Sequence, residues 1–114
     1  MVDDTDVNIR LMEAILKPAG YEVITASLGR ESIEIAADGS IDIILMDISL
    51  PDISGTQAMK EIRDTVYGNK PVIAVTAHAM RGDKEKFQSE GFDGYISKPI
   101  DIQEMLRMIE DFLG

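Results

Sequence analysis

Hydrophobic positions along this chain follow two alternating patterns. Continuous apolar runs are typical of strands buried on both faces, and they predict strands at 21–25, 42–47, 71–76 and 92–98, with Val2 as the last residue of an earlier strand. Apolar residues at helical spacing lie between these runs and after the last of them. Strands that alternate with helices in this way predict an α/β domain, with a parallel sheet and helices on both of its faces.

Five helices are expected, at about 7–16, 28–37, 56–66, 80–90 and 102–113. Asp6, Ser27 and Asp101 stand where N-cap residues are preferred, and Asp101 followed by Glu104 resembles a capping box. The inward faces are expected to carry Val7, Leu11, Ala14, Ile15, Ile33, Ala36, Ala37, Met59, Ile62, Phe87, Ile102, Met105, Leu106, Ile109 and Leu113. The fourth helix is polar apart from Phe87, and a poorly anchored helix is a candidate moving part.

Composition narrows the class of protein. With 114 residues the chain is expected to form one compact domain over residues 1–114, and 45% hydrophobic residues are enough for a core. It contains no apolar run long enough for a membrane span and no signal-peptide pattern, and the absence of cysteine fits the cytoplasm. A net charge of -10 disfavours binding to nucleic acid and anionic membranes, and favours metal cations and basic partner surfaces.

Polar residues stand at the ends of the predicted strands. If all strands are parallel, Asp3, Asp4, Asp47, Thr76 and Lys98 converge on one edge of the sheet. Clustered carboxylates repel one another, and a hard divalent cation, most plausibly a magnesium ion (Mg²⁺), would hold them ionised together. An aspartate beside such a cation is a competent nucleophile toward phosphorus, so the set has the parts for making an aspartyl phosphate.

These residues also resemble a known family. The chain is similar, over nearly its whole length, to the receiver domain of two-component response regulators, through Val2-Asp3-Asp4, Leu45-Met46-Asp47-Ile48-Ser49-Leu50-Pro51, Gly55, Val75-Thr76-Ala77 and Lys98-Pro99. The resemblance implies a flavodoxin-like, doubly wound parallel sheet of five strands in the order 2-1-3-4-5. It also implies a signalling switch that accepts a phosphoryl group from a sensor histidine kinase or a histidine phosphotransfer protein.

By that resemblance, Asp47 is the phosphoacceptor. Asp4 and Asp47 would bind Mg²⁺ together with the backbone carbonyl of Ser49, and Asp3 would act through a water molecule on the metal. Such a domain catalyses only its own phosphorylation and dephosphorylation. Its output would pass to a downstream protein target or a fused output domain.

The resemblance implies switch residues as well. Thr76 would move to contact the phosphoryl group, Lys98 would pair with Asp47, and Tyr95 would turn inward when Thr76 moves. From the residues alone, Tyr95 is also compatible with ordinary strand packing. His78, the one histidine, is expected to be a solvated loop residue that affects water access to the phosphoryl group. The Lys98-Pro99 peptide bond is predicted to be cis, because this turn directs the lysine toward the phosphoacceptor in the family.

Parts of the sequence also fit three other classes of protein. A phosphohydrolase of the haloacid dehalogenase type would use Asp4 as its nucleophile, from the spacing Asp4-x-Asp6. It would need a full strand before this motif and a second acidic pair late in the chain, where only Asp101, Glu104 and the helical Glu110-Asp111 follow Lys98. An EF-hand starting at Asp4 fails, because Ile9 and Ile15 stand where glycine and glutamate are required. A non-phosphorylated interaction module on the same fold is disfavoured by the intact acidic set.

The first strand departs from the family pattern, because only Met1 and Val2 precede the acidic pair. Three or four missing aliphatic residues would forfeit roughly 5 to 12 kcal/mol of burial, which is comparable to the stability of a small domain. The gap is therefore expected to be filled by another chain, through a dimer or a strand exchange, by a rearranged segment, or by residues outside this sequence. Metal binding by Asp3 and Asp4 depends on this strand.

Overall fold

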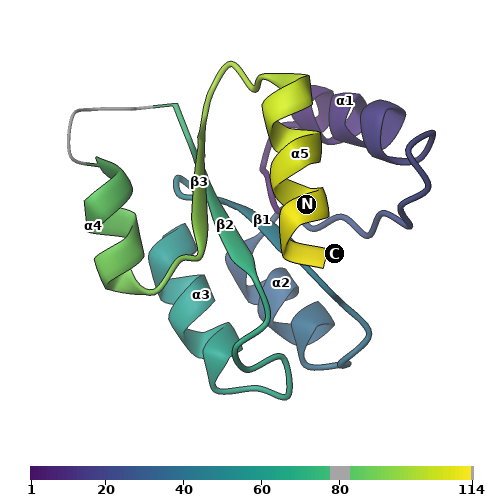
Figure 1. Cartoon of the computed structure of the whole chain (residues 1–114). Coiled ribbons are helices and arrows are strands. Elements are labelled where there is room, and N and C mark those ends of the chain that lie inside the picture. Colours follow the sequence, from purple (N-terminus) through teal and green to yellow (C-terminus); the bar gives the residue numbers. More distant parts are fainter. Residues whose placement is uncertain (78–82, 114) are drawn as a thin grey trace.

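The computed structural model describes residues 1–77 and 83–113. Along the chain its elements are α1 (Asp6–Leu16), α2 (Gly29–Ala36), β1 (Ile44–Asp47), α3 (Gly55–Arg63), β2 (Val72–Thr76), α4 (Asp83–Glu90), β3 (Gly94–Ser97) and α5 (Ile102–Leu113) (Figure 1). The alternation of strands and helices after residue 44 is the predicted one. No helix among the described residues combines the length and apolar character that crossing a membrane requires.

The sheet has three parallel strands in the order β1-β2-β3. Beside β1, Val2 forms isolated parallel bridges with Met46 on one side and Ala26 on the other. The predicted strand at 21–25 is not assigned, which corrects that expectation: the hydrogen bonds of this segment to the neighbouring Met1–Asp3 are confined to Ile24 and Ala26. Five strands were expected, and three are present as strands.

The core lies in two layers, one on each face of the sheet. Leu45, Ile73, Val75 and Ile96 face α1 and α5, whereas Ile44, Met46, Val72 and Ala74 face α2, α3 and α4. Successive strand residues therefore point to opposite faces, and both faces are covered. This burial explains why the strands read as continuous apolar runs in the sequence. α1 and α5 cover one face in Figure 1, and α2 and α3 cover the other.

The orientation of α1 differs from the prediction. Val7 and Leu11 are 71% and 50% exposed, and Met12 and Leu16 are the residues that the helix buries. Met12 and Leu16 are four residues apart and share one side of the helix, so the Val7–Leu11 side turns toward solvent. The N-cap residue is Thr5 rather than Asp6, and its side chain makes no capping hydrogen bond.

Smaller corrections concern α2 and α5. In α2 the N-cap is Leu28 rather than Ser27, and Ala37 lies exposed beyond the helix end. In α5 the buried residues are Met105 and Ile109, while the predicted inward residues at the two helix ends, Ile102 and Leu113, are exposed. The inward residues of α3 are confirmed, as is the capping of α5 by Asp101, whose carboxylate accepts a hydrogen bond from the backbone of Glu104.

A cavity lies where the first strand is short. It has a volume of about 360 Å³, and residues 20–26 and 40–45 line it together with Met1 and Val2. Those two segments flank Met1–Asp3 farther along, so the cavity continues the line of Met1–Asp3. Among the described residues no rearranged segment fills the cavity, and its occupation by another chain or by residues outside this sequence stays a prediction.

Candidate functional site

The candidate site forms where the parallel strands end. β1 ends at Asp47 and β2 at Thr76, and both side chains are buried. Lys98 follows β3, and its backbone N–H donates to the Thr76 carbonyl at 2.7 Å. The N-terminal segment reaches the same edge because Asp47 donates its backbone N–H to the Val2 carbonyl at 2.9 Å. The predicted convergence of these strand ends is therefore present.

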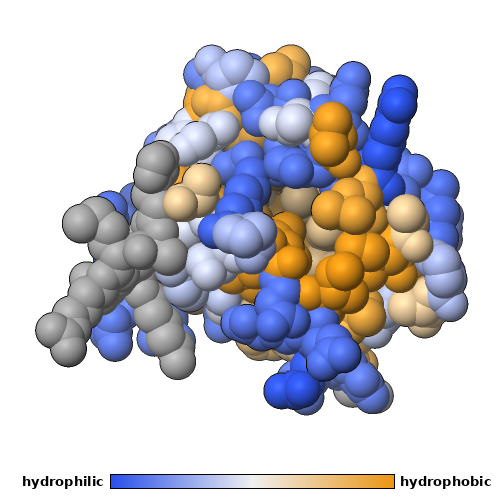
Figure 2. Space-filling model, turned by 90° about the horizontal axis from the view of Figure 1, so that it is seen from above, coloured by the Kyte–Doolittle hydropathy of each residue, from blue (hydrophilic) through white to orange (hydrophobic). Residues whose placement is uncertain are grey.

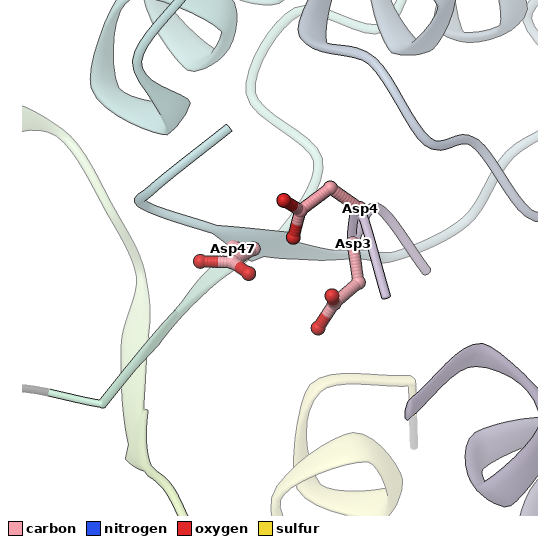
Figure 3. Close-up of side chains that lie close together, drawn as sticks. All are labelled: Asp3, Asp4 and Asp47. Carbon is pink, nitrogen blue, oxygen red and sulfur yellow. The ribbon is translucent and has the colours of Figure 1, made fainter. Parts of the chain in front are cut away.

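Three carboxylates gather at this edge. Asp3, Asp4 and Asp47 each offer one oxygen, and these oxygens all lie within 4.8 Å of one another (Figure 3). Asp3 and Asp47 are buried, whereas Asp4 is exposed. Carboxylates this close repel one another when ionised, and a hard cation with oxygen ligands relieves that repulsion. The donor set therefore fits Mg²⁺.

Lys98 places a positively charged ammonium group beside two of these carboxylates. Its Nζ lies 3.1 Å from Oδ2 of Asp3 and 3.1 Å from Oδ2 of Asp47. Burial alone lowers the pKa of Lys98, but the hydrogen bonds and negative charges of Asp3 and Asp47 outweigh it and raise that pKa above 10.5. Lys98 is therefore charged at neutral pH and bridges the two buried acids. The peptide bond between Lys98 and Pro99 is cis, as predicted.

Asp3 is held by more than the lysine. It is fully buried, and its carboxylate accepts hydrogen bonds from the backbone N–H of Thr5 at 2.9 Å and from Nδ2 of Asn8 at 3.2 Å. These two donors orient the carboxylate toward Lys98 and offset part of the cost of burying it. The sequence analysis did not single out Asn8. Its place in the first turn of α1, next to the acidic pair, is the signal that was available.

The loop after Asp47 is closed tightly against the strand end. The backbone N–H of Ser49 donates to Oδ1 of Asp47 at 2.9 Å, and that of Gly55 donates to the Ile48 carbonyl at 2.9 Å. A Cβ atom on Gly55 would lie 2.2 Å from the Asp47 carbonyl oxygen, so only glycine fits there. Ser54 then caps α3 by accepting from Gln57. The carbonyl group of Ser49 belongs to this closed loop.

The two predicted switch residues lie on the neighbouring strands. Thr76 ends β2, and Tyr95 lies in β3, paired in register with Ala74. The Tyr95 ring stacks on Phe87 of α4, with centroids 5.7 Å apart, and Phe92 meets the same Phe87 edge-on. Tyr95 thus packs β3 against α4. His78 lies outside the described residues.

The surface at this edge is divided by polarity. Seen from above, hydrophobic side chains gather around a hollow near the middle of the face, and hydrophilic residues border them (Figure 2). Because the strands run upward in Figure 1, this is the face onto which their carboxyl ends open.

Comparisons with known proteins agree with this geometry. A family model described as the response regulator receiver domain matches residues 1–110. The chain is 39% identical to the polar-differentiation response regulator DivK of Brucella ovis, over all of this chain and 94% of that protein.

Solved structures give the same likeness. The receiver domain of a sensor histidine kinase from Pseudomonas aeruginosa, which has a magnesium ion coordinated in its active site cleft, is 36% identical with a TM-score of 0.89, covering 99% of this chain and 93% of that one. A response regulator structure from Chloroflexus aurantiacus has a TM-score of 0.90 at 29% identity, covering 98% and 93%.

Proposed function

The chain belongs to the response regulator receiver domain family, and from this we propose that residues 1–114 form one phosphorylation-dependent signalling switch, with Asp47 as its phosphoacceptor and Mg²⁺ as its cofactor. The five-stranded order 2-1-3-4-5 is part of this proposal. The two bridges of Val2, to Ala26 and to Met46, support the central place of the N-terminal segment in that order.

The observation that carries the proposal is the position of Lys98. Its ammonium group contacts the buried carboxylates of Asp3 and Asp47 at the same distance, although Lys98 follows β3, which is not adjacent to the strand that ends at Asp47. A partly exposed cation between two buried acids at the carboxyl edge of a parallel sheet has a chemical use: it can neutralise an incoming phosphoryl oxygen beside the nucleophile. Ordinary stabilisation of the fold does not require a third carboxylate at the same place.

Asp4, Asp47 and the backbone carbonyl of Ser49 would hold the metal directly, and Asp3 would act through water. When bound, Mg²⁺ supplies positive charge that offsets the charge on the phosphoryl oxygens. The donors are carboxylate and carbonyl oxygens, the ligand type that this ion prefers. A related receiver domain holds a magnesium ion in its active site cleft, which supports the assignment.

Four residues of the chain would then have separate roles in phosphoryl transfer and in the response to it. A carboxylate oxygen of Asp47 forms the new bond to phosphorus while the bond to the donor breaks, and Lys98 stabilises the charge on the transferred group. Thr76 would move to donate its hydroxyl to a phosphoryl oxygen. Tyr95 would then turn inward, which would break its stacking on Phe87 and so change the surface of α4.

The donor would be a histidine kinase or a histidine phosphotransfer protein, and the receiver of the signal a protein target or a fused output domain in the cytoplasm. The relatives include a response regulator and a receiver domain of a sensor histidine kinase, so both contexts occur among them. The net charge of -10 supports a protein partner over nucleic acid.

Intact mass spectrometry tests the proposal. Incubation with a small phosphodonor should add about 80 Da, one phosphoryl group, with Mg²⁺ present and not with a chelator. Asp47→Asn should abolish the adduct, while Asp64→Asn, at an exposed position after α3, should leave it unchanged. Labelling of the Asp47→Asn variant at Asp4 would favour the phosphohydrolase reading, and an unlabelled wild type would favour a non-phosphorylated module.

A further inference from the structure

The loop that carries Ser49 is attached to a second element at its middle. Both carboxylate oxygens of Asp52 accept backbone hydrogen bonds from the start of α2: Gly29 donates to Oδ1 at 2.9 Å and Arg30 donates to Oδ2 at 2.9 Å. α2 receives no capping bond from the side chain of its own N-cap, Leu28. A residue more than twenty positions away therefore caps this helix, and the same contact holds the loop.

An apolar contact lies beside these hydrogen bonds. A Cβ atom added to Gly29 would lie 2.6 Å from Cγ1 of Ile53, the residue after Asp52. The loop therefore packs directly on the α2 backbone, with no room for a side chain between them. The two hydrogen bonds of Asp52 and this contact form one joint, here called the α2 joint.

The α2 joint connects the two segments that supply the carboxylates. α2 follows three residues after Ala26, which donates its backbone N–H to the Met1 carbonyl and accepts from the backbone N–H of Asp3, both at 3.0 Å. The N-terminal segment with Asp3 and Asp4 is thereby fixed to the chain that leads into α2. On the other side, the loop that begins at Asp47 is fixed to the first residues of α2.

We propose that Asp52 is a positioning residue, which fixes the loop bearing the Ser49 carbonyl relative to Asp3 and Asp4 and so sets the affinity of the site for Mg²⁺. This inference rests on the proposed function, because it assigns Asp52 a role toward the metal of that site. Asp52 itself touches neither the metal ligands nor the phosphoryl group. Its effect is to remove freedom from the loop before the metal binds, which lowers the cost of ordering the site.

Titration of Mg²⁺ into the purified chain by calorimetry tests this directly. Asp52→Asn replaces one of the two acceptor oxygens by an amide NH2 group, so one of the two backbone hydrogen bonds is lost, and Mg²⁺ binding should weaken about three- to tenfold. Gly29→Ala disturbs the same joint without changing charge, because its methyl group must displace Ile53, and it should weaken binding similarly. In the double variant the affinity for Mg²⁺ should fall by less than the product of the two single fold-changes, since both substitutions act on one joint.

Two further measurements separate positioning from other causes. Hydrogen exchange of the metal-free chain should be faster in residues 48–54 of both variants than in the wild type, whereas Asp64→Asn should match the wild type. If Asp52 acts only through its charge, the loss for Asp52→Asn should vanish at 0.5 M salt and Gly29→Ala should bind normally, which would overturn the inference. Phosphorylation rates of both variants should approach the wild-type rate at saturating Mg²⁺.

The possible failures are distinguishable. If the wild type binds Mg²⁺ and is phosphorylated while both variants bind it as tightly as the wild type, the positioning role of Asp52 is wrong and the proposed function stands. Lower melting temperatures with an unchanged Mg²⁺ dissociation constant would also overturn it. If the wild type itself does not bind Mg²⁺, both the metal site and this inference are wrong.

Discussion

Removing the charge of Asp4 should have opposite effects on stability without and with metal. Asp4 is the exposed member of the acidic cluster, and the two ion pairs of Lys98 are formed with the other two members. In the metal-free protein the ionised Asp4 therefore repels two neighbours. Asp4→Asn keeps the shape of the side chain and removes this repulsion.

The size of the effect follows from the geometry. Each carboxylate pair has oxygens within 4.8 Å, where two unit charges repel by about 0.9 kcal/mol in water and about 3.5 kcal/mol at an effective dielectric of 20. The exposure of Asp4 places it near the water limit. Two such pairs, partly offset by Lys98, predict that Asp4→Asn raises the free energy of unfolding by about 1 kcal/mol, or roughly 4 °C in melting temperature.

Thermal and urea unfolding, in EDTA and in Mg²⁺, measure both halves of the prediction. At a Mg²⁺ concentration 100 times the dissociation constant, binding stabilises the wild type by about 2.7 kcal/mol. The variant loses a proposed ligand and should gain much less, so the order of stabilities should reverse. Asp64→Asn, which removes an exposed charge after α3, should change by less than about 0.5 kcal/mol in either condition.

Two results would refute this reasoning. A loss of stability for Asp4→Asn in EDTA would mean that its carboxylate is a net stabilising group, and that the repulsion is absorbed by Lys98 or by solvent. Equal stabilisation of both proteins by Mg²⁺ would mean that Asp4 is not part of the metal site. Neither result bears on the phosphoacceptor role of Asp47, which intact mass spectrometry of the phosphoryl adduct tests.

Three further predictions concern other parts of the chain. Lys98→Met should lower the free energy of unfolding by about 1 to 3 kcal/mol in urea at pH 7, because it leaves two buried acids without their cation, although the lysine side chain itself is 22% exposed. Since the pKa of Lys98 is raised, the higher stability of the wild type should persist below pH 10.5 and disappear as pH rises through the raised pKa. Equal urea midpoints at pH 7 would contradict this prediction. The Asp52 carboxyl should titrate in NMR with a pKa of about 2, chiefly because the Arg30 backbone N–H donates to it. The contribution of this carboxylate to stability is therefore present above pH 3.8 and is lost as pH falls toward 2. A titration midpoint near 3.8 would show that the α2 joint does not form in solution. If another chain fills the cavity beside Val2, sedimentation velocity should show self-association, and a monomer with an ordinary cooperative melt that binds Mg²⁺ would remove the argument.

The residues of the site were predictable because their signals are local. A run of buried residues that ends at Asp47 or Thr76 marks the end of a strand wherever the strand lies in the sheet, and the parallel arrangement then brings the ends together. The capping of α5 by Asp101 and the inward residues of α3 likewise depend on a few neighbouring positions. The family resemblance added the roles, which remain proposals.

The remaining features depend on contacts between distant segments. α1 has apolar residues on more than one side, and only packing against the sheet decides that Met12 and Leu16 are buried while Val7 and Leu11 are not. The segment 21–25 has the residues of a strand, but a strand also needs a paired neighbour, and the short N-terminal segment supplies hydrogen bonds only at Ile24 and Ala26.

By itself, then, the sequence determined which chemical groups end the strands, where most helices begin, and the alternation that makes the sheet parallel. Only the tertiary structure decided that Lys98 contacts Asp3 as well as Asp47, that Asn8 orients Asp3, and that Asp52 caps a helix more than twenty residues away. The physical reason is the range of the interactions. Strand burial and helix caps act within a few residues, whereas the partner of a loop carboxylate is set by how whole elements pack.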